Sequence, residues 1–286
     1  MNKIYRLYEN LVPPFLQKPL LSTIYTLSDC IHLPKDISYN FSLKNSSISE
    51  SACILATGPS LKDHDLSFLK NVDCYSVSNF FLHPQLNAIR PLIHFFAPYH
   101  KPLLIDNFVE WLRKAHIILP SSTKICLGVR DKQIVEKFNL FEGRSIYYLK
   151  LGKAPSYSIF DPTKTVLAPY TSPIMILPLL LYMGYKKVFL LGCDNNTLKN
   201  YKGSISNFYS PDKEIRLNAT SGDKWDRGIM NELIEQLAQF KQYDFYNKFY
   251  SKMNTKLYNC SNDSWIDFIE YMPLEKLKDQ LQISSR

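Results

Sequence analysis

A short turn is the first feature of this chain whose residue types could do chemistry. An apolar run over residues 52–56 stops at Thr57, Gly58, Pro59 and Ser60, and the polar stretch that follows predicts a helix near residues 62–68. Backbone N–H groups at the start of a helix have no partner within the helix and carry partial positive charge, so an anion such as phosphate can bind them. The same turn also occurs without any ligand. Its meaning therefore depends on what lies beside it.

Polar side chains also stand at the ends of other predicted elements. Asn79 ends a strand predicted for residues 73–79, and three polar residues follow the strand predicted for 187–191. Ligands of open α/β sheets bind beyond the carboxyl ends of the strands. We therefore expect one crevice lined by Thr57, Gly58, Pro59, Ser60, Asn79, Thr171, Ser172, Asp194, Asn195 and Asn196. Purely structural roles are alternatives to ligand binding, because Asn79 could cap the next segment and Asp194 could be a helix cap or a turn residue.

The chemistry of this set favours a nucleotide or a sugar nucleotide over a metal. It offers hydroxyls, amides and helix starts with a single acid, and the sequence contains neither a Walker motif nor a GxGxxG. His100 lies in a proline-flanked loop after the strand predicted for 92–97, a suitable place for a general base. His94 lies inside that strand, where a hydrogen-bonded core histidine is expected. His64 and His83 are weaker candidates.

Composition sets limits on the partners and the compartment. The 286 residues carry a formal net charge of +8, which favours an anionic partner, although a basic protein without such a site is an equal alternative. The six cysteines are scattered without metal-binding spacing, and a disulfide framework is not expected in a chain of this size. No apolar run reaches the roughly 18 residues of a membrane span, and no signal peptide is visible. We expect a cytoplasmic protein.

The chain divides into a leader, residues 1–48, and one α/β domain, residues 49–286. The leader is amphipathic and mildly basic, so it could lie on an anionic membrane surface or dock on the domain itself. A polar linker is expected at 40–50, a loop at 150–166 and a lid at 197–223, because long irregular stretches in compact domains are often functional. The remaining patterns predict strands at 52–56, 73–79, 92–97, 116–119, 125–129, 145–149, 187–191 and 256–259, and helices at 62–68, 106–115, 133–138, 171–182, 225–249 and within 264–281.

Three blocks of the sequence resemble the bacterial sialyltransferases of glycosyltransferase family 42. Residues 56–62, ATGPSLK, are similar to the family's GNGPSLK, and residues 78–81, SNFF, are similar to its CNQFYF. Residues 170–173, YTSP, with residues 182–194, YMGYKKVFLLGCD, are similar to its ITSG and ALGYKEIYLSGID. The similarity runs in order over about residues 52–270, but only these blocks are specific.

The resemblance implies a single Rossmann-like domain of GT-A type with a mostly parallel sheet and a mobile lid. It implies an inverting, metal-independent enzyme that moves a nonulosonic acid of the sialic acid type from a CMP-sugar donor to a glycan acceptor of lipopolysaccharide or capsule, without a further cofactor. By position, Thr57, Gly58 and Ser60 would line the CMP pocket, Asn79 would contact the donor, and Ser172 would touch the nucleotide or the sialyl group. Tyr201 or Tyr209, from the lid, would bind the departing phosphate.

The chain departs from the family at positions that matter. Thr57 replaces an Asn, Pro169 stands where an Arg is expected, and no histidine follows His116, although the family's general base is a histidine after the lid. The resemblance therefore requires another base. His100 is the first choice, because a strand end places it toward the same crevice, and Asp194 is the second.

Two other functions remain open at this level. A different nucleotide-dependent transferase, such as a pyrophosphokinase, could use the same turn, and a non-catalytic protein could dock on a membrane through the leader. We expect no nucleic-acid partner. Contact with the inner face of the cytoplasmic membrane and assembly into a homo-oligomer are both left open by the sequence.

Overall fold

The structure, a computed structural model, describes residues 13, 20, 23, 35–100, 103–153, 160–203, 206–214 and 228–284. Most of the predicted leader and part of the predicted lid lie outside these residues. Among the described residues, no helix is both long and apolar enough to cross a membrane.

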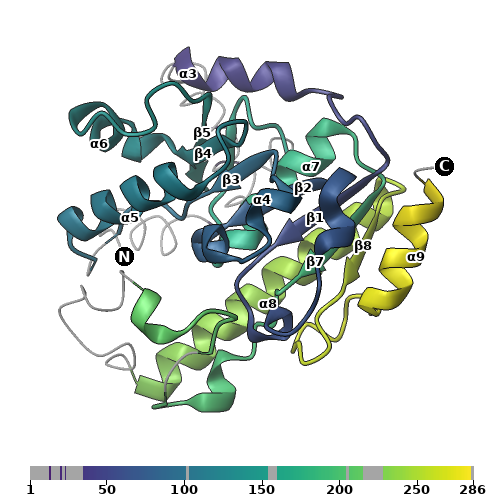
Figure 1. Cartoon of the computed structure of the whole chain (residues 1–286). Coiled ribbons are helices and arrows are strands. Elements are labelled where there is room, and N and C mark those ends of the chain that lie inside the picture. Colours follow the sequence, from purple (N-terminus) through teal and green to yellow (C-terminus); the bar gives the residue numbers. More distant parts are fainter. Residues whose placement is uncertain are drawn as a thin grey trace.

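The described core is a sheet of eight strands in the order β6-β5-β4-β3-β2-β1-β7-β8, and every pairing between neighbours is parallel (Figure 1). The predicted α/β fold with a parallel, Rossmann-like sheet is confirmed. The strands are β1 (Ser51–Leu55), β2 (Asp73–Val77), β3 (Ile93–Phe95), β4 (Lys124–Gly128), β5 (Ile146–Gly152), β6 (Thr165–Leu167), β7 (Lys187–Leu191) and β8 (Lys256–Asn259).

Helices cover both faces of the sheet. The chain moves from β1 to β6 in one direction and then returns to the other side of β1 for β7 and β8. Because crossovers between parallel strands are right-handed, helices that connect strands added on one side of β1 lie on one face of the sheet, and those that lead to the other side lie on the opposite face. The first core cluster accordingly contains residues of α4 (Leu86–Ile89), α5 (Ile105–Ile118), α6 (Lys132–Lys137) and α9 (Leu274–Ser284), and the second contains residues of α7 (Leu177–Met183) and α8 (Gly228–Lys252).

Each central strand contributes to both core clusters by alternation. In β1, Cys53 and Leu55 belong to one cluster, whereas Ala52 and Ile54 belong to the other. Because both faces are buried, these strands read as continuous apolar runs rather than as an alternating pattern. The burial of Cys53, together with that of four further cysteines, agrees with the prediction of thiols in apolar surroundings.

The helix predicted near residues 62–68 is absent. Two short 3₁₀ turns stand there instead, η2 (Pro59–Leu61) and η3 (Ser67–Asn71). The side chain of Asp65 accepts hydrogen bonds from the N–H and the hydroxyl of Ser67, both at 2.9 Å, which holds a local turn in place of a helical one.

Two further predictions between β3 and β7 are wrong. Residues 116–119 do not form a strand, because α5 continues to Ile118 and the guanidinium of Arg144 donates to carbonyls at its end, those of His116 at 2.9 Å and Leu119 at 2.7 Å. The predicted loop 150–166 contains the last residues of β5 and the first residues of β6. β6 is an edge strand of three residues, too short to give an alternating pattern in the sequence.

The start of the described chain packs on the domain. It forms α3 (Lys35–Ser38) and η1 (Tyr39–Leu43). Asn40, expected to open a polar linker, is instead fully buried, and its amide donates to the carbonyls of Tyr148 and Pro162, both at 2.8 Å.

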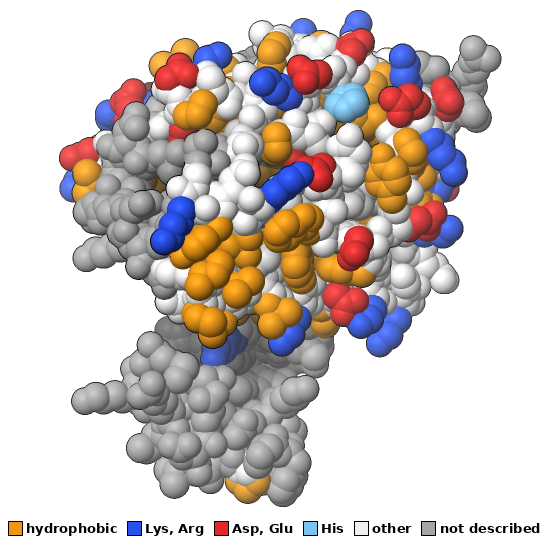
Figure 2. All heavy atoms as spheres, turned by 90° about the horizontal axis from the view of Figure 1, so that it is seen from below, with side chains coloured by type: hydrophobic (Ala, Val, Ile, Leu, Met, Phe, Trp, Pro, Cys, Tyr) orange, Lys and Arg blue, Asp and Glu red, His pale blue; other side chains and the backbone are white. Residues whose placement is uncertain are grey.

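The helix predicted for 225–249 appears as α8, which runs without interruption through Tyr243. Its first half does not have an apolar inner face and a polar outer one, because it buries Gln236 while exposing apolar side chains. The exposed ones are Ile229, Met230, Leu233, Ile234 and Leu237. Seen from below, hydrophobic side chains gather near the middle of the surface (Figure 2).

His94 is a hydrogen-bonded core histidine, as predicted. Its Nδ1 lies 2.7 Å from the Ser76 hydroxyl and its Nε2 lies 3.0 Å from the carbonyl oxygen of Ser78. Burial lowers its pKa to about 3, because charge is costly away from water. Ser78 adopts a left-handed backbone with φ of 56°, so the His94 contact holds a conformation that serine rarely adopts.

We expect His94 to make stability fall in acid. In the unfolded chain the imidazole of His94 gains a proton below the ordinary pKa of 6.5, whereas in the folded chain it stays neutral down to a pKa of about 3. The contribution of His94 to the free energy of unfolding is therefore complete above pH 6.5 and is lost as the pH falls from 6.5 toward 3. The slope from this proton is about 1.4 kcal/mol per pH unit. Urea unfolding between pH 4 and 7.5 should show a shallower acid loss for His94→Gln. The exposed control His64→Gln should keep the wild-type slope, and equal slopes in all three proteins would contradict the assignment.

Candidate functional site

β1 and β7 are parallel neighbours in the sheet. Strands β2 to β6 are added on one side of β1, whereas β7 and β8 are added on the other, so the order of the strands reverses between β1 and β7. In open parallel sheets this switch point opens a crevice at the carboxyl ends of the strands, and ligands bind there. The two turns that leave the strands run together, since the N–H of Gly58 donates to the carbonyl of Gly192 at 2.9 Å. The predicted first and last parts of the site are therefore adjacent.

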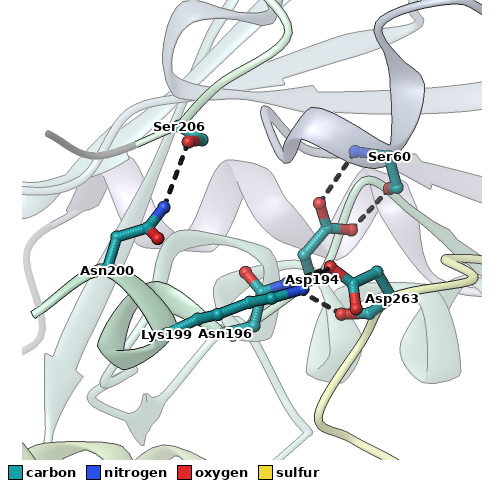
Figure 3. Close-up of polar contacts among 7 residues, drawn as sticks. All are labelled: Ser60, Asp194, Asn196, Lys199, Asn200, Ser206 and Asp263. Atoms are coloured by element: carbon teal, nitrogen blue, oxygen red, sulfur yellow. Dashed lines mark hydrogen bonds and ion pairs between the residues drawn. The ribbon is translucent and has the colours of Figure 1, made fainter.

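Ser60 and Asp194 join these two turns. The Ser60 N–H donates to one carboxylate oxygen of Asp194 at 2.9 Å, and the Ser60 hydroxyl donates to the other at 2.5 Å (Figure 3). Asp194 is 3% exposed. The anion bound at the predicted turn is thus the chain's own carboxylate, and both oxygens of Asp194 already have partners in this conformation.

The two asparagines after Asp194 anchor their own loop. The amide of Asn195 donates to the side chain of Gln239 on α8 at 3.1 Å. The amide of Asn196 donates to the backbone carbonyl of Asp263 at 2.8 Å, and Lys199 forms an exposed ion pair with Asp263 at 2.8 Å (Figure 3). Tyr201 follows on the same side, after η7 (Thr197–Asn200). These contacts hold the β7 side of the crevice in place.

Asn79 is at the centre of a buried polar cluster beyond β2. Its amide nitrogen donates to the hydroxyl of Tyr209 at 3.0 Å and to the carboxylate of Glu214 at 2.9 Å. The indole N–H of Trp111, on α5, donates to its amide oxygen at 2.5 Å. The structure thus brings together two predicted site residues, Asn79 and Tyr209, that are 130 positions apart.

One described part of the predicted lid, residues 206–214, lies over the ends of β1 and β2. The Phe208 N–H donates to the carbonyl of Thr57 at 3.2 Å. Its ring makes edge contacts with Phe80, at a centroid distance of 5.9 Å, and with His83, at 5.1 Å. Burial lowers the pKa of His83, consistent with a packing role.

Thr171 and Ser172 also lie at the carboxyl-end edge of the sheet, but they precede a helix rather than directly follow a strand. They begin η6 (Ser172–Met175), which contacts β2 and leads into α7. Because α7 carries the chain back toward the start of β7, its first turns lie at the carboxyl ends of the strands. Gln242 on α8 holds the preceding loop, accepting from the Tyr170 N–H and donating to the Ala168 carbonyl, both at 2.8 Å.

His100 is exposed in the loop that follows β3, two strands from β1. Asp131, 1% exposed, supports this loop by accepting from the N–H of Tyr99 at 3.1 Å. Burial raises the pKa of Asp131 to about 6, and the hydrogen bond from the Tyr99 N–H opposes that rise. His100 thus stands at the expected edge of the sheet with its ring open to solvent.

The sequence did not single out Glu214 or Trp111. Glu214 is 3% exposed and accepts hydrogen bonds from both Asn79 and Tyr209. An acid in a polar, irregular segment gives no periodic pattern, and Trp111 is one of several apolar residues on the buried face of α5. Only the folded chain shows that both side chains belong to the Asn79 cluster.

No group of three or more metal-ligating side chains occurs within the described part of the chain. No family model and no curated protein sequence matches the chain.

Solved structures do match it. The chain is similar to the sialyltransferase CstII of Campylobacter jejuni in complex with the substrate analogue CMP-3FNeuAc, with 18% identity and a TM-score of 0.46, over 78% of this chain and 86% of that one. It is also similar to a sialyltransferase CST-II structure with a trisaccharide acceptor and CMP, with 18% identity and a TM-score of 0.47 over the same shares.

Gly58 is the position where the site tolerates least change. A Cβ at residue 58 would lie 2.5 Å from both the Asp194 carboxyl carbon and the Gly192 carbonyl oxygen, so Gly58→Ala should cost about 1–3 kcal/mol. Urea unfolding measures this loss. The control Gly152→Ala meets only a methyl group of Thr165, at 3.1 Å, and should lose less. Equal stability of the two variants would count against the close approach of the two turns.

Proposed function

We propose that the protein is a glycosyltransferase that moves a nonulosonic acid of the sialic acid type from a CMP-sugar to a glycan acceptor of lipopolysaccharide or capsule. The transfer would proceed with inversion and without a metal ion. The reaction class follows from the sequence resemblance, and the convergence of the resembling blocks in the folded chain supports it.

The single observation that carries the proposal is the meeting of the three blocks at one edge of the sheet. Ser60 of the first block hydrogen-bonds Asp194 of the third, at 2.9 and 2.5 Å. Asn79 of the second block follows β2, the strand next to β1. Neighbouring parallel strands end at the same edge of a sheet, and here each of the three adjacent strand ends carries one of the resembling blocks.

The proposed roles combine what the resemblance implies with where the residues lie. Thr57, Gly58, Pro59 and Ser60 form the nucleotide side of the pocket, with Asn195 and Asn196 holding its far wall. Thr171 and Ser172 would offer hydroxyl groups that can stabilise a phosphate without a cation. Tyr209, or Tyr201, would contact the leaving phosphate from the lid.

His100 is the proposed general base. It would remove the proton of the acceptor hydroxyl during in-line attack, and its solvent-exposed position after β3 leaves it accessible to an acceptor. Asp194, the second candidate, has both carboxylate oxygens hydrogen-bonded to Ser60. That arrangement favours a positioning role for Asp194.

The cellular setting is part of the proposal. The CMP-sugar and the glycan acceptor are the expected partners, and the enzyme would work in the cytoplasm. The leader, with Lys3, Arg6 and Lys18 among apolar residues, would keep it near the inner face of the cytoplasmic membrane.

CMP should protect the protein against thermal unfolding. At about 100 times its Kd a ligand adds about 2.7 kcal/mol, which corresponds to a Tm rise of about 5 °C or more in a chain of this size. AMP and UMP at the same concentration should give a smaller rise. A response to ATP that requires magnesium, with none to CMP, would instead favour a pyrophosphokinase.

His100→Ala should lose turnover while keeping donor binding. Removing a general base costs about a hundredfold or more in kcat. CMP release from CMP-sialic acid with a galactose-terminated acceptor measures the loss, and the CMP-induced rise in Tm should persist. The control His116→Ala removes an imidazole at the far end of α5 and should keep its activity. Full turnover of His100→Ala would reject the assignment of the base.

A further inference from the structure

Glu214 places a carboxylate inside the proposed donor pocket. One of its oxygens, Oε2, accepts from the Asn79 amide at 2.9 Å and from the Tyr209 hydroxyl at 2.7 Å. The residue is 3% exposed. Burying a carboxylate is costly unless donors surround it, so these two contacts help to stabilise Glu214 in this position.

The hydrogen-bonding capacity of Asn79 is nearly used up in this arrangement. A side-chain amide has two N–H donors, and those of Asn79 are directed at Tyr209 and Glu214, while Trp111 donates to its oxygen. The amide and the phenol are neutral donors that converge on one oxygen of an anion. They therefore form an oxyanion-binding pair that is filled by the chain itself.

The pair lies where the donor's anionic group is expected. Asn79 follows β2, and the backbone of the segment that carries Glu214 is joined to Thr57 beyond β1 through Phe208, at 3.2 Å. A phosphate held by Asn79 and Tyr209 would need the oxygen position that Glu214 occupies. The two anions would also repel each other if both were present.

We propose that Glu214 is an internal ligand that competes with the donor phosphate for Asn79 and Tyr209. Without donor, its carboxylate fills the pair and fixes residues 206–214 over the strand ends. When a donor binds, the phosphate takes the place of the carboxylate, and the segment re-forms around the ligand. This inference rests on the proposed function for the identity of the donor, whereas the oxyanion pair itself rests on the geometry alone.

Removing the charge of Glu214 should tighten anion binding. Calorimetric titration of CMP and of inorganic phosphate into wild type and Glu214→Gln tests this, and the variant should bind at least one of the two about fivefold more tightly or better. Asp212→Asn is the matched control, since it removes one negative charge from an exposed position on the same segment and should change binding less than twofold. If Glu214→Gln does not fold, Glu214→Asp, which withdraws the carboxylate by one methylene, should show the same direction.

The outcomes separate this inference from the proposed function. If the wild type binds CMP, and the Glu214 variants bind CMP and phosphate no more tightly than Asp212→Asn does, the proposed competition is wrong. The transferase proposal then still stands. Glu214 variants that gain affinity for phosphate, in a protein whose wild type ignores CMP, support the oxyanion pair and reject the CMP-sugar. Variants that bind both ligands more weakly than wild type, or no better than the control, overturn the inference.

Discussion

The bond between Ser60 and Asp194 is the contact on which the rest of the site depends. It joins the turns after β1 and β7, the two parallel strands between which the order of the strands reverses. The turns can approach so closely because residues 58 and 192 are glycines, and a side chain at either would meet the opposite turn. A buried carboxylate that accepts a backbone N–H and a hydroxyl is well satisfied, so the two turns act as one rigid wall.

A second constraint lies beyond β2 and acts through the backbone. Ser78 has a left-handed conformation, held by the contact between its carbonyl and the neutral ring of His94. This kink comes directly before Asn79, whose amide then ties residues 206–214 to the sheet. Backbone strain of this kind persists where the surroundings fix it, and it occurs often at functional sites. The core histidine therefore contributes to the site through Asn79, without touching a ligand.

Polar residues on the buried side of α8 interrupt the usual apolar inner face of the helix. Gln236 donates to the carbonyl of Asn195 at 3.0 Å, and Gln242 holds the loop before Thr171. These glutamines face irregular backbone at the edge of the sheet rather than apolar strand residues. A helix that supports two site loops must offer hydrogen bonds on that side, since buried backbone groups need partners.

The sequence by itself determined the parallel α/β fold, the burial of His94 and the residues that gather at the carboxyl ends of the strands. Strong apolar runs and glycine turns are local patterns, so they can be read without the fold. The tertiary structure alone decided which partner each polar residue takes. Asp194, read as a base or a cap, binds Ser60, and Asn79 meets Tyr209 and the unforeseen Glu214. Those pairings depend on strand order and crossover direction, which bring distant residues into contact and leave no local trace.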